Sequence, residues 1–174
     1  MPPLRVRLII AAAVAIYCTT TGCAGLQLGM STGSGVGVGV GVGAPMGNVP
    51  ATQLRDLGDR INGYRTRHGA RALAWDDRLA AVARRHSEDM ARRGYFAHVD
   101  PDGHDPFARL DAAGIRWRAA AENIAEGQRT TREVYDGWIE STPHRENIER
   151  REYTHYGLGV YRYRWTLLLA RYRD

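Results

Sequence analysis

Residues 76–103 read DDRLAAVARRHSEDMARRGYFAHVDPDG, and this stretch decides how the rest of the chain is interpreted. Four of its residues recur at intervals of four, three and four, the spacing of one face of a helix. These residues are Leu79, Ala83, His86 and Met90. Asp76 or Asp77 can cap the start of the helix, and Gly94 marks its end. The pattern therefore predicts a helix that carries His86 on its apolar face.

A loop follows this helix and begins at a second histidine. Residues 98–103 read His-Val-Asp-Pro-Asp-Gly. Pro101 fixes φ within a turn, and Gly103 permits the conformation in which the chain leaves it. His98 is therefore expected at the entrance of a surface loop, a common place for binding and catalytic residues.

Another helix is expected before the quoted stretch. Its apolar face is formed by residues spaced three or four apart, which are Leu54, Leu57, Ile61 and Tyr64. The helix should end near His68 and Gly69, because glycine favours helix termination. A short extended segment over residues 72–75 then leads to the helix that contains His86.

A short helix and a strand are expected after the loop. Pro106 is typical of the first position of a helix, which should end at Ala113. Ile115, Trp117 and Ala119 alternate with other residues in the pattern of a strand. This strand leads into Glu122.

Helices precede strands over most of the domain. Thr130 and Glu133 predict a capping box for a helix, and Pro143 begins a further short helix that contains His144. Two strand-like segments, 156–161 and 165–172, lie close enough in sequence to form a hairpin. Because strands and helices do not alternate as βαβ units, the pattern favours an α+β domain built in layers.

The composition is that of one soluble domain with appendages. Of 174 residues, 44% are hydrophobic and 25% are charged, and the mean hydropathy of -0.42 excludes a protein that crosses a membrane several times. Cys18 and Cys23 are the only cysteines, which excludes a disulfide framework or a cysteine-based zinc site after residue 23. A metal site in the domain must therefore use His, Asp or Glu.

The net charge of +5 does not indicate a nucleic-acid partner. All 24 basic residues are arginine, and they alternate with acidic residues, as in Arg84, Arg85, Glu88 and Asp89. A stripe of one sign, which a nucleic-acid interface requires, is absent from the sequence. We therefore expect no nucleic acid among the partners.

Residues 1–23 are expected to form an export signal. Arg5 and Arg7 precede an apolar segment from Leu8 to Cys18 that is too short to span a bilayer as a mature helix. The sequence TTGC at 20–23 then resembles a bacterial lipobox, although the usual leucine is replaced by Thr20. Cys23 is therefore a candidate lipidation site that would anchor the protein to a membrane. Secretion without a lipid, after cleavage elsewhere, and an uncleaved anchor are the alternatives.

Residues 24–50 are expected to form a linker, followed by the folded domain over 51–174. Residues 33–43 read GSGVGVGVGVG, in which valine alternates with glycine as in a strand. Glycine loses the most entropy on ordering and offers no side chain for packing. A flexible linker that holds the domain away from the membrane is therefore the better interpretation.

Several blocks of residues occur in a characteristic order along the domain. They are Leu79-Ala80, Ala83, His86-Ser87, Asp89-Met90, Tyr95-Phe96-Ala97-His98, Pro101-Asp102-Gly103, Ala121-Glu122-Asn123-Ile124-Ala125, Trp138 with Ser141, His144-Arg145 with Asn147-Ile148, Tyr156-Gly157-Leu158-Gly159-Val160 and Trp165-Thr166. This ordered set, over residues 54–170, resembles the bacterial SCP-like branch of the CAP superfamily, named for cysteine-rich secretory proteins, antigen 5 and pathogenesis-related 1. The resemblance implies an exported three-layer α-β-α sandwich with a surface cleft lined by His and Glu.

The resemblance also implies which residues line the cleft. It places His98, Glu122 and His144 there as catalytic or metal-binding residues. Many eukaryotic members have a second glutamate at the position of Ser141, whereas serine is typical of the bacterial branch. His86 could take this fourth place.

Two imidazoles and one carboxylate brought together by the fold suit a Zn²⁺ ion with an open fourth position. Such an ion would activate water for hydrolysis, and without metal a His and Glu pair can serve as general acid and base. Structural roles are equally open at this stage. His86 could be a core histidine bonded to the backbone, and Glu122 with Asn123 could hold a turn between strand and loop.

The sequence leaves three functions open for this exported protein, which would be anchored to the membrane by lipid or extracellular. The preferred one is a cell-envelope module that binds lipid, glycan or peptide, because the resemblance includes lipid binders and seldom a clear catalytic activity. The second is a metal-dependent hydrolase that acts on peptide or envelope polymer. The third is a structural or partner-binding envelope protein in which the His and Glu residues stabilise the fold.

Overall fold

A computed structural model of the chain describes residues 49–173. The expected export signal at 1–23, with the lipidation site Cys23, lies outside the described residues, as does the linker at 24–50 apart from Val49 and Pro50. These expectations therefore stay predictions. Within the described part of the chain, no helix has the length and apolar character needed to cross a membrane.

Residues 49–173 form five helices and four strands in the expected order. The helices are α1 (Ala51–Arg67), α2 (Asp77–Arg93), α3 (Pro106–Ala112), α4 (Thr131–Glu140) and α5 (Thr142–Glu149). The strands are β1 (Ala74–Trp75), β2 (Trp117–Glu126), β3 (His155–Tyr161) and β4 (Arg164–Tyr172).

Local capping interactions explain where the helices begin and end. The Asp76 carboxylate accepts hydrogen bonds from the backbone N–H groups of Arg78 and Leu79 at the start of α2. Gly94 ends α2 in the left-handed conformation at φ 71°. The predicted capping box at the start of α4 is confirmed, since Thr130 and Glu133 each bond the other's backbone N–H.

The strands form one sheet in the order β1-β3-β4-β2. The predicted hairpin is confirmed, with β3 and β4 antiparallel and Leu158 opposite Leu167. Strand β2 pairs antiparallel to β4 and forms one edge, whereas the two-residue β1 pairs parallel to β3 at the other edge. Residues from both ends of the domain therefore meet in the sheet.

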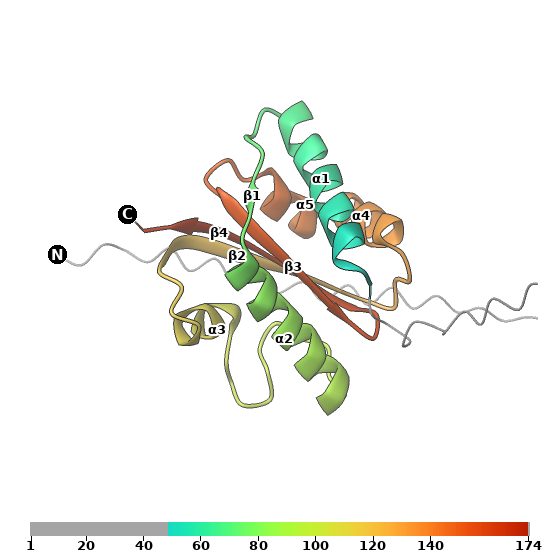
Figure 1. Cartoon of the computed structure of the whole chain (residues 1–174), viewed down its shortest axis with the longest axis vertical. Coiled ribbons are helices and arrows are strands. Elements are labelled where there is room, and N and C mark those ends of the chain that lie inside the picture. Colours follow the sequence, from blue (N-terminus) through green and yellow to red (C-terminus); the bar gives the residue numbers. More distant parts are fainter. Residues whose placement is uncertain (1–48, 174) are drawn as a thin grey trace, which may run out of the picture.

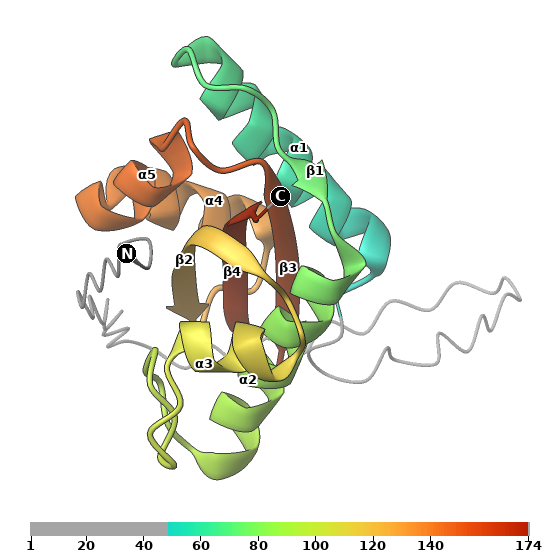
Figure 2. The same cartoon turned by 90° about the vertical axis from the view of Figure 1, so that its left-hand side faces the viewer.

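Helices cover both faces of this sheet, which confirms the three-layer α-β-α arrangement. In Figure 1, α1, α4 and α5 lie on one side of the strands and α2 and α3 on the other. Figure 2, turned by 90° about the vertical axis, again shows α1, α4 and α5 in the upper part of the picture and α2 and α3 in the lower part, with the strands between them. Each face of the sheet consequently has its own apolar core.

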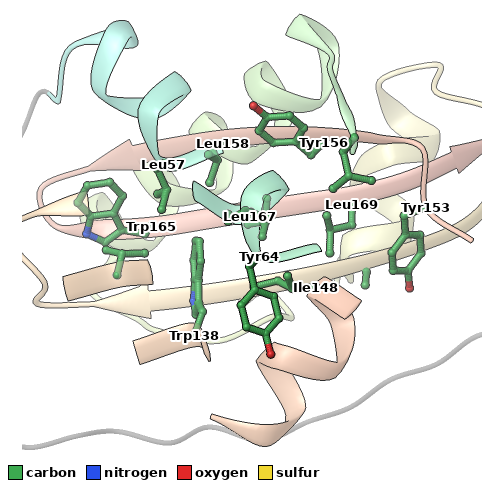
Figure 3. Packing of buried hydrophobic residues seen from close by; sticks show 14 of the residues in the cluster. Leu57, Tyr64, Trp138, Ile148, Tyr153, Tyr156, Leu158, Trp165, Leu167 and Leu169 are labelled. Carbon is green, nitrogen blue, oxygen red and sulfur yellow. The ribbon is translucent and has the colours of Figure 1, made fainter. Parts of the chain in front are cut away.

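The larger core lies between the sheet and helices α1, α4 and α5. Figure 3 shows its side chains, among which Leu57, Trp138, Trp165 and Leu167 are at most 1% exposed. All four are large, so their removal from water is a main source of stability on this side. The indole N–H of Trp165 donates to the carbonyl oxygen of Gln128, which satisfies the one polar atom of that buried side chain.

The second core requires α2 to lie directly on β3. A Cβ atom at Gly157 would be 2.1 Å from the backbone nitrogen of Ala80, and one at Gly159 would be 2.1 Å from that of Arg84. No side chain fits at either position, so glycine permits the close approach of helix and strand. This contact holds α2, and with it His86, in a fixed position over the sheet.

A buried arginine joins α1 to α5. Arg65 is fully buried and donates only to backbone carbonyl oxygens, which belong to Arg71, Ile148, Arg150 and Tyr153. Two of these carbonyls lie at the C-terminal end of α5, where backbone acceptors lack helical partners. Arg65 therefore caps α5 with side-chain donors from another helix.

Candidate functional site

Glu122 lies in the middle of β2, the edge strand, and its side chain is 1% exposed. The sequence-based alternative that Glu122 and Asn123 hold a strand-to-loop turn is therefore wrong, because both residues pair with β4. Successive side chains of a strand point to opposite faces. Glu122 faces residues of α2 and α3, whereas Asn123 contacts α5.

His98 is bound to this buried carboxylate. Its Nδ1 atom lies 2.9 Å from Oε1 of Glu122 and donates the hydrogen, since a carboxylate can only accept. The Nε2 atom of His98 is consequently left for other partners, and 22% of the side chain is exposed. The predicted contact between His98 and Glu122 is thus present, and it orients the imidazole towards the surface.

Arg109 of α3 binds the other oxygen of the same carboxylate. Its Nη2 donates to Oε2 of Glu122 at 2.8 Å, and its Nη1 donates to the carbonyl oxygen of His104. Sequence reasoning missed this residue, because an arginine near the end of a short helix usually only complements the helix dipole. Its buried charge is nevertheless the direct partner of Glu122.

His86 is both a hydrogen-bonded core residue and a neighbour of Glu122. Its Nε2 lies 3.1 Å from the carbonyl oxygen of Ala97 and 3.8 Å from Oε1 of Glu122. Since both neighbours are acceptors, Nε2 carries the hydrogen. Burial lowers the pKa of His86, against the opposing effect of the Glu122 charge, so the imidazole is neutral at neutral pH.

These four residues, Glu122, His86, His98 and Arg109, are called the Glu122 cluster below. Burial acts to raise the pKa of Glu122, but the hydrogen bond from His98 and the charge of Arg109 outweigh it, so the pKa is lowered. Glu122 therefore stays ionised inside the protein. Its two oxygens are already engaged by a ring N–H and a guanidinium.

His144 lies beside the cluster but hydrogen-bonds a different residue. Its Nδ1 is 2.8 Å from the hydroxyl oxygen of Ser141, the residue that precedes α5. Burial and the charge of His98 both lower the pKa of His144. Asn123 fixes this end of α5, because its side chain donates to the carbonyl oxygen of His144 and accepts from Asn147. Helix α5 is thereby held against the edge strand.

The arrangement does not fit a zinc ion held by His98, Glu122 and His144. Ligand atoms of three such residues should approach one another closely around the ion. Among the described residues, the one group of three with ligand atoms within 4.8 Å of one another is Asp100, Asp102 and His104. His98 and Arg109 already donate hydrogen bonds to the two oxygens of Glu122. Zinc binding at these residues stays a prediction.

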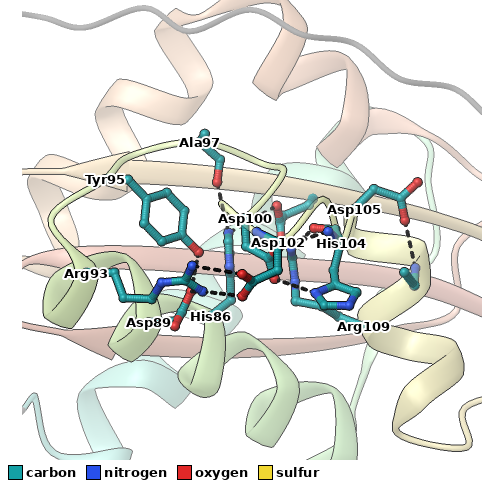
Figure 4. A network of polar contacts seen from close by, with 12 residues as sticks. His86, Asp89, Arg93, Tyr95, Ala97, Asp100, Asp102, His104, Asp105 and Arg109 are labelled. Atoms are coloured by element: carbon teal, nitrogen blue, oxygen red, sulfur yellow. Dashed lines mark hydrogen bonds and ion pairs between the residues drawn. The ribbon is translucent and has the colours of Figure 1, made fainter.

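The Asp100, Asp102 and His104 group holds the loop in shape. Asp100 accepts hydrogen bonds from the backbone N–H groups of Asp102 and His104 and from the His104 ring, while Asp102 pairs with Arg93 (Figure 4). Removal from water acts to raise the pKa of Asp100, but the hydrogen bonds from His104 and Asp102 together outweigh it and lower the pKa. The loop that carries His98 is therefore internally braced.

A cavity of about 360 Å³ opens beside the Glu122 cluster. It lies between α2 and the loop that follows it, and His86 and Arg109 both line it. The other lining residues carry charged side chains and are Arg85, Glu88, Asp89, Arg92 and Asp100. Figure 4 shows how several of these side chains lie with respect to the loop. Sequence reasoning did not anticipate this cavity, because its walls come from three segments.

Comparison with known proteins finds one family and several bacterial relatives. Residues 59–167 match the family model described as "CAP: Cysteine-rich secretory protein family". Two curated relatives come from Bacillus subtilis strain 168. Uncharacterized protein YkwD is 40% identical over 98 residues, and uncharacterized membrane protein YlbC is 35% identical over 118 residues. The aligned segments cover 56% and 68% of this chain but 38% and 34% of those proteins. The chain thus matches little more than a third of either relative.

Two solved structures have the same fold. One is an extracellular protein containing a SCP domain from Bacillus anthracis str. Ames, with a TM-score of 0.67 and 33% identity over 69% of this chain and 40% of that one. The other is an outer surface protein from Borrelia burgdorferi, with a TM-score of 0.66 and 17% identity over 73% of this chain and 98% of that one. At 17% identity, the second likeness concerns the fold alone.

Proposed function

Because the chain belongs to the cysteine-rich secretory protein (CAP) family, we propose that it is an exported cell-envelope protein that binds a polar envelope ligand at the Glu122 cluster. The ligand would be a glycan or a peptide. Support for export comes from the apolar segment after Arg5 and Arg7 and from the extracellular and surface proteins that share the fold. The Cys23 anchor is part of the same proposal.

The observation that carries the proposal is the fixed geometry of His98. Its Nδ1–H is held by a fully buried carboxylate, which Arg109 holds in turn, so the imidazole is oriented before any ligand arrives. A side chain that is already in place loses little entropy on binding. Its Nε2 atom, which carries no hydrogen when Nδ1 donates to Glu122, can then accept a hydrogen bond from a polar ligand.

The described surface favours a polar ligand over a lipid. Val99, at 47% exposed, is the one large hydrophobic residue exposed among residues 49–173. The cavity beside the cluster is lined by charged and imidazole side chains. An acyl chain needs exposed apolar side chains to replace its contacts with membrane, and among the large ones the described surface offers only Val99.

Co-sedimentation tests this function. The full-length protein carrying Cys23→Ser, which removes lipidation at that residue, is mixed with purified peptidoglycan or with vesicles of phosphatidylglycerol and phosphatidylethanolamine. We expect it to pellet with peptidoglycan and His98→Ala to weaken this binding several-fold. The matched control is His68→Ala, because His68 is an exposed histidine at the end of α1. Equal pelleting with vesicles, or no pelleting with peptidoglycan, would overturn the proposal.

A hydrolase is the second candidate, and the contact between His98 and Glu122 favours it. An imidazole oriented by a carboxylate is the usual arrangement of a general base. If a metal takes part, hydrolysis of peptidoglycan stem peptides should stop in chelator and return with zinc. If His98 acts alone, turnover should be unaffected by chelator and lost in His98→Ala.

A further inference from the structure

Ser141 is the one serine among residues 49–173 that is not buried. The other serine in this range, Ser87, is fully buried and hydrogen-bonds Gly159 and Thr166 inside the protein. Ser141 is partly exposed and lies between the end of α4 and the start of α5. Any reactivity of its hydroxyl therefore depends on what the fold places beside it.

The hydroxyl of Ser141 is hydrogen-bonded to an imidazole. Its Oγ lies 2.8 Å from Nδ1 of His144, and this is the only hydrogen bond that the side chain makes within the described residues. A serine before a helix commonly accepts from a backbone N–H of the first turn, but Ser141 does not cap α5 in this way. The hydroxyl is therefore directed at His144 and not used for helix capping.

The imidazole of His144 is able to take the proton of this hydroxyl. When the ring carries its hydrogen on Nε2, Nδ1 presents a lone pair to which the Ser141 hydroxyl donates. The Nε2 atom has no partner in the described part of the chain and is not among the buried unpaired atoms, so water can bond it. A hydroxyl that donates to a neutral imidazole is the arrangement in which a general base activates a nucleophile.

Contacts from neighbouring elements hold the two residues in this relation. Asn123 of β2 donates to the carbonyl oxygen of His144, and Arg145 of α5 donates to the carbonyl oxygen of Ile139 in α4. Neither contact uses the side chain of Ser141 or His144. Replacement of either side chain should therefore leave this part of the fold in place.

The start of α5 supplies donors for a developing negative charge. The first N–H groups of a helix have no partner within it, and no side chain caps those of α5. Pro143 carries no N–H, whereas the N–H groups of Thr142 and His144 have no backbone partner among the described residues. The N–H that directly follows a nucleophilic serine at the start of a helix is a usual donor to the oxyanion of acyl transfer.

We propose that Ser141 is the nucleophile and His144 the general base of a site that hydrolyses acyl esters of polar envelope compounds. Oγ of Ser141 forms a bond to the ester carbonyl carbon while its proton passes to Nδ1 of His144. The bond from that carbon to the alcohol oxygen then breaks, and the alcohol takes the proton. Water next attacks the acyl-serine, which releases the carboxylic acid and restores the hydroxyl.

An ester suits this pair better than an amide. In the described part of the chain no carboxylate pairs with His144, so the third group that orients the base of a triad is missing. An alcohol leaves more readily than an amine and asks less of the base. The site adjoins the Glu122 cluster, because His98 is close enough for its charge to act on His144. The inference rests on the proposed function only for the polar character of the substrate.

Active-site labelling of the full-length protein tests the proposal. A fluorophosphonate reacts with an activated serine hydroxyl, and hydrolysis of 4-nitrophenyl acetate measures turnover. We expect one phosphonate per chain, located at Ser141 by mass mapping of peptides. Ser141→Ala should abolish the labelling. Ser141→Ala and His144→Ala should each lower kcat/KM for the ester about 100-fold, a usual contribution of a general base.

Thr154→Ala is the matched control. The hydroxyl of Thr154 also lies 2.8 Å from an imidazole Nδ1, that of His155, but it precedes a strand and not a helix. This variant should leave labelling and turnover unchanged. Equal losses in Thr154→Ala, or no labelling at Ser141, would overturn the inference. Turnover that is lost in His98→Ala and kept in Ser141→Ala would overturn it in favour of His98 as the base. Pelleting with peptidoglycan in the absence of labelling would leave the proposed function standing and remove this inference alone.

Discussion

Arg109 and Glu122 form a buried ion pair at the edge of the sheet, in which Nη2 lies 2.8 Å from Oε2 and the two side chains are 13% and 1% exposed. The pair connects α3 to β2 and lies between the cavity and the His98 imidazole. The ion pair thus holds both Arg109 in the cavity wall and, through Glu122, the His98 imidazole in position.

Removal of the arginine should leave an unpaired charge inside the protein. We expect Arg109→Met to lower the free energy of unfolding at pH 7 by about 3–5 kcal/mol, the usual cost of breaking a buried pair. Urea denaturation measures it. Arg132→Met is the control, because its ion pair with Asp136 is on the surface and should matter little. Similar losses in the two variants would contradict the buried role of Arg109.

The start of α2 should make the protein sensitive to acid. Burial acts to raise the pKa of Asp76, but hydrogen bonds from the Tyr172 hydroxyl and from the first N–H groups of α2 outweigh it and lower the pKa below its usual range. A lowered carboxyl pKa stabilises the fold above the unfolded value, and this contribution is lost as pH falls through the folded value.

We therefore expect Asp76→Asn, whose amide can cap α2 but offers one acceptor fewer to Tyr172 and no charge, to be less stable than the wild type at pH 7 by about 1–2 kcal/mol, and the difference to shrink below about pH 4. Urea denaturation at several pH values measures it. Tyr172→Phe removes one of the bonds that lower the pKa and should reduce the same pH dependence. A difference that is constant from pH 7 to pH 3 would be inconsistent with an ionised cap.

The glycines of β3 should not tolerate a methyl group. In Gly157→Ala the new Cβ would lie 2.1 Å from a backbone nitrogen of α2, which no side-chain rotation relieves. We expect Gly157→Ala to lower the free energy of unfolding by about 3 kcal/mol and to lower the melting temperature. Gly137→Ala is the opposite case, because Gly137 lies in α4 with no atom within 4 Å of its added Cβ. It should stabilise the protein by about 0.5–1 kcal/mol, since alanine favours helix.

The turn between β3 and β4 carries strain that a double substitution should release. Arg162 and Tyr163 have φ values of 46° and 61°, the left-handed region that glycine and asparagine favour. We expect Arg162→Asn with Tyr163→Gly to raise the free energy of unfolding by roughly 1 kcal/mol. Arg129 lies in an exposed loop and does not have a positive φ, so Arg129→Gly should instead lower the stability of the protein slightly. An unchanged melting temperature in the double variant would contradict the assignment of strain.

Patterns among residues close together in the sequence predicted the helices and strands of this fold well. The spacing of Leu79 and Met90, the capping box at Thr130 and the hairpin after Tyr156 all depend on neighbouring residues, and the structure confirms them. The alternating glycines of β3 were not interpreted from the sequence, and their role in the close approach to α2 emerges only from the structure.

Contacts between residues far apart in the sequence could not be predicted from these local patterns. The family resemblance predicted that His98 and Glu122 lie close together. The other two residues beside Glu122, Arg109 and His86, lie on helices whose relative positions are set by packing. The strand-to-loop interpretation of Glu122 was wrong because the run of small residues at 119–121 gave no sign of how far the strand extends. The cavity depends on three segments at once, so no single stretch predicts it.

The position of Arg65 has a consequence for the order in which the chain can fold. Its side chain ends α5 through carbonyl oxygens 83 and 85 residues further along the chain, and β1 pairs with β3 across a similar distance. During synthesis, which proceeds from the N-terminus, α1 and β1 cannot complete these contacts until α5 and β3 have been made. Contacts of such long sequence separation also form slowly. The emerging chain therefore stays open through most of its synthesis, the state in which an unfolded polypeptide can be threaded through a narrow translocation channel.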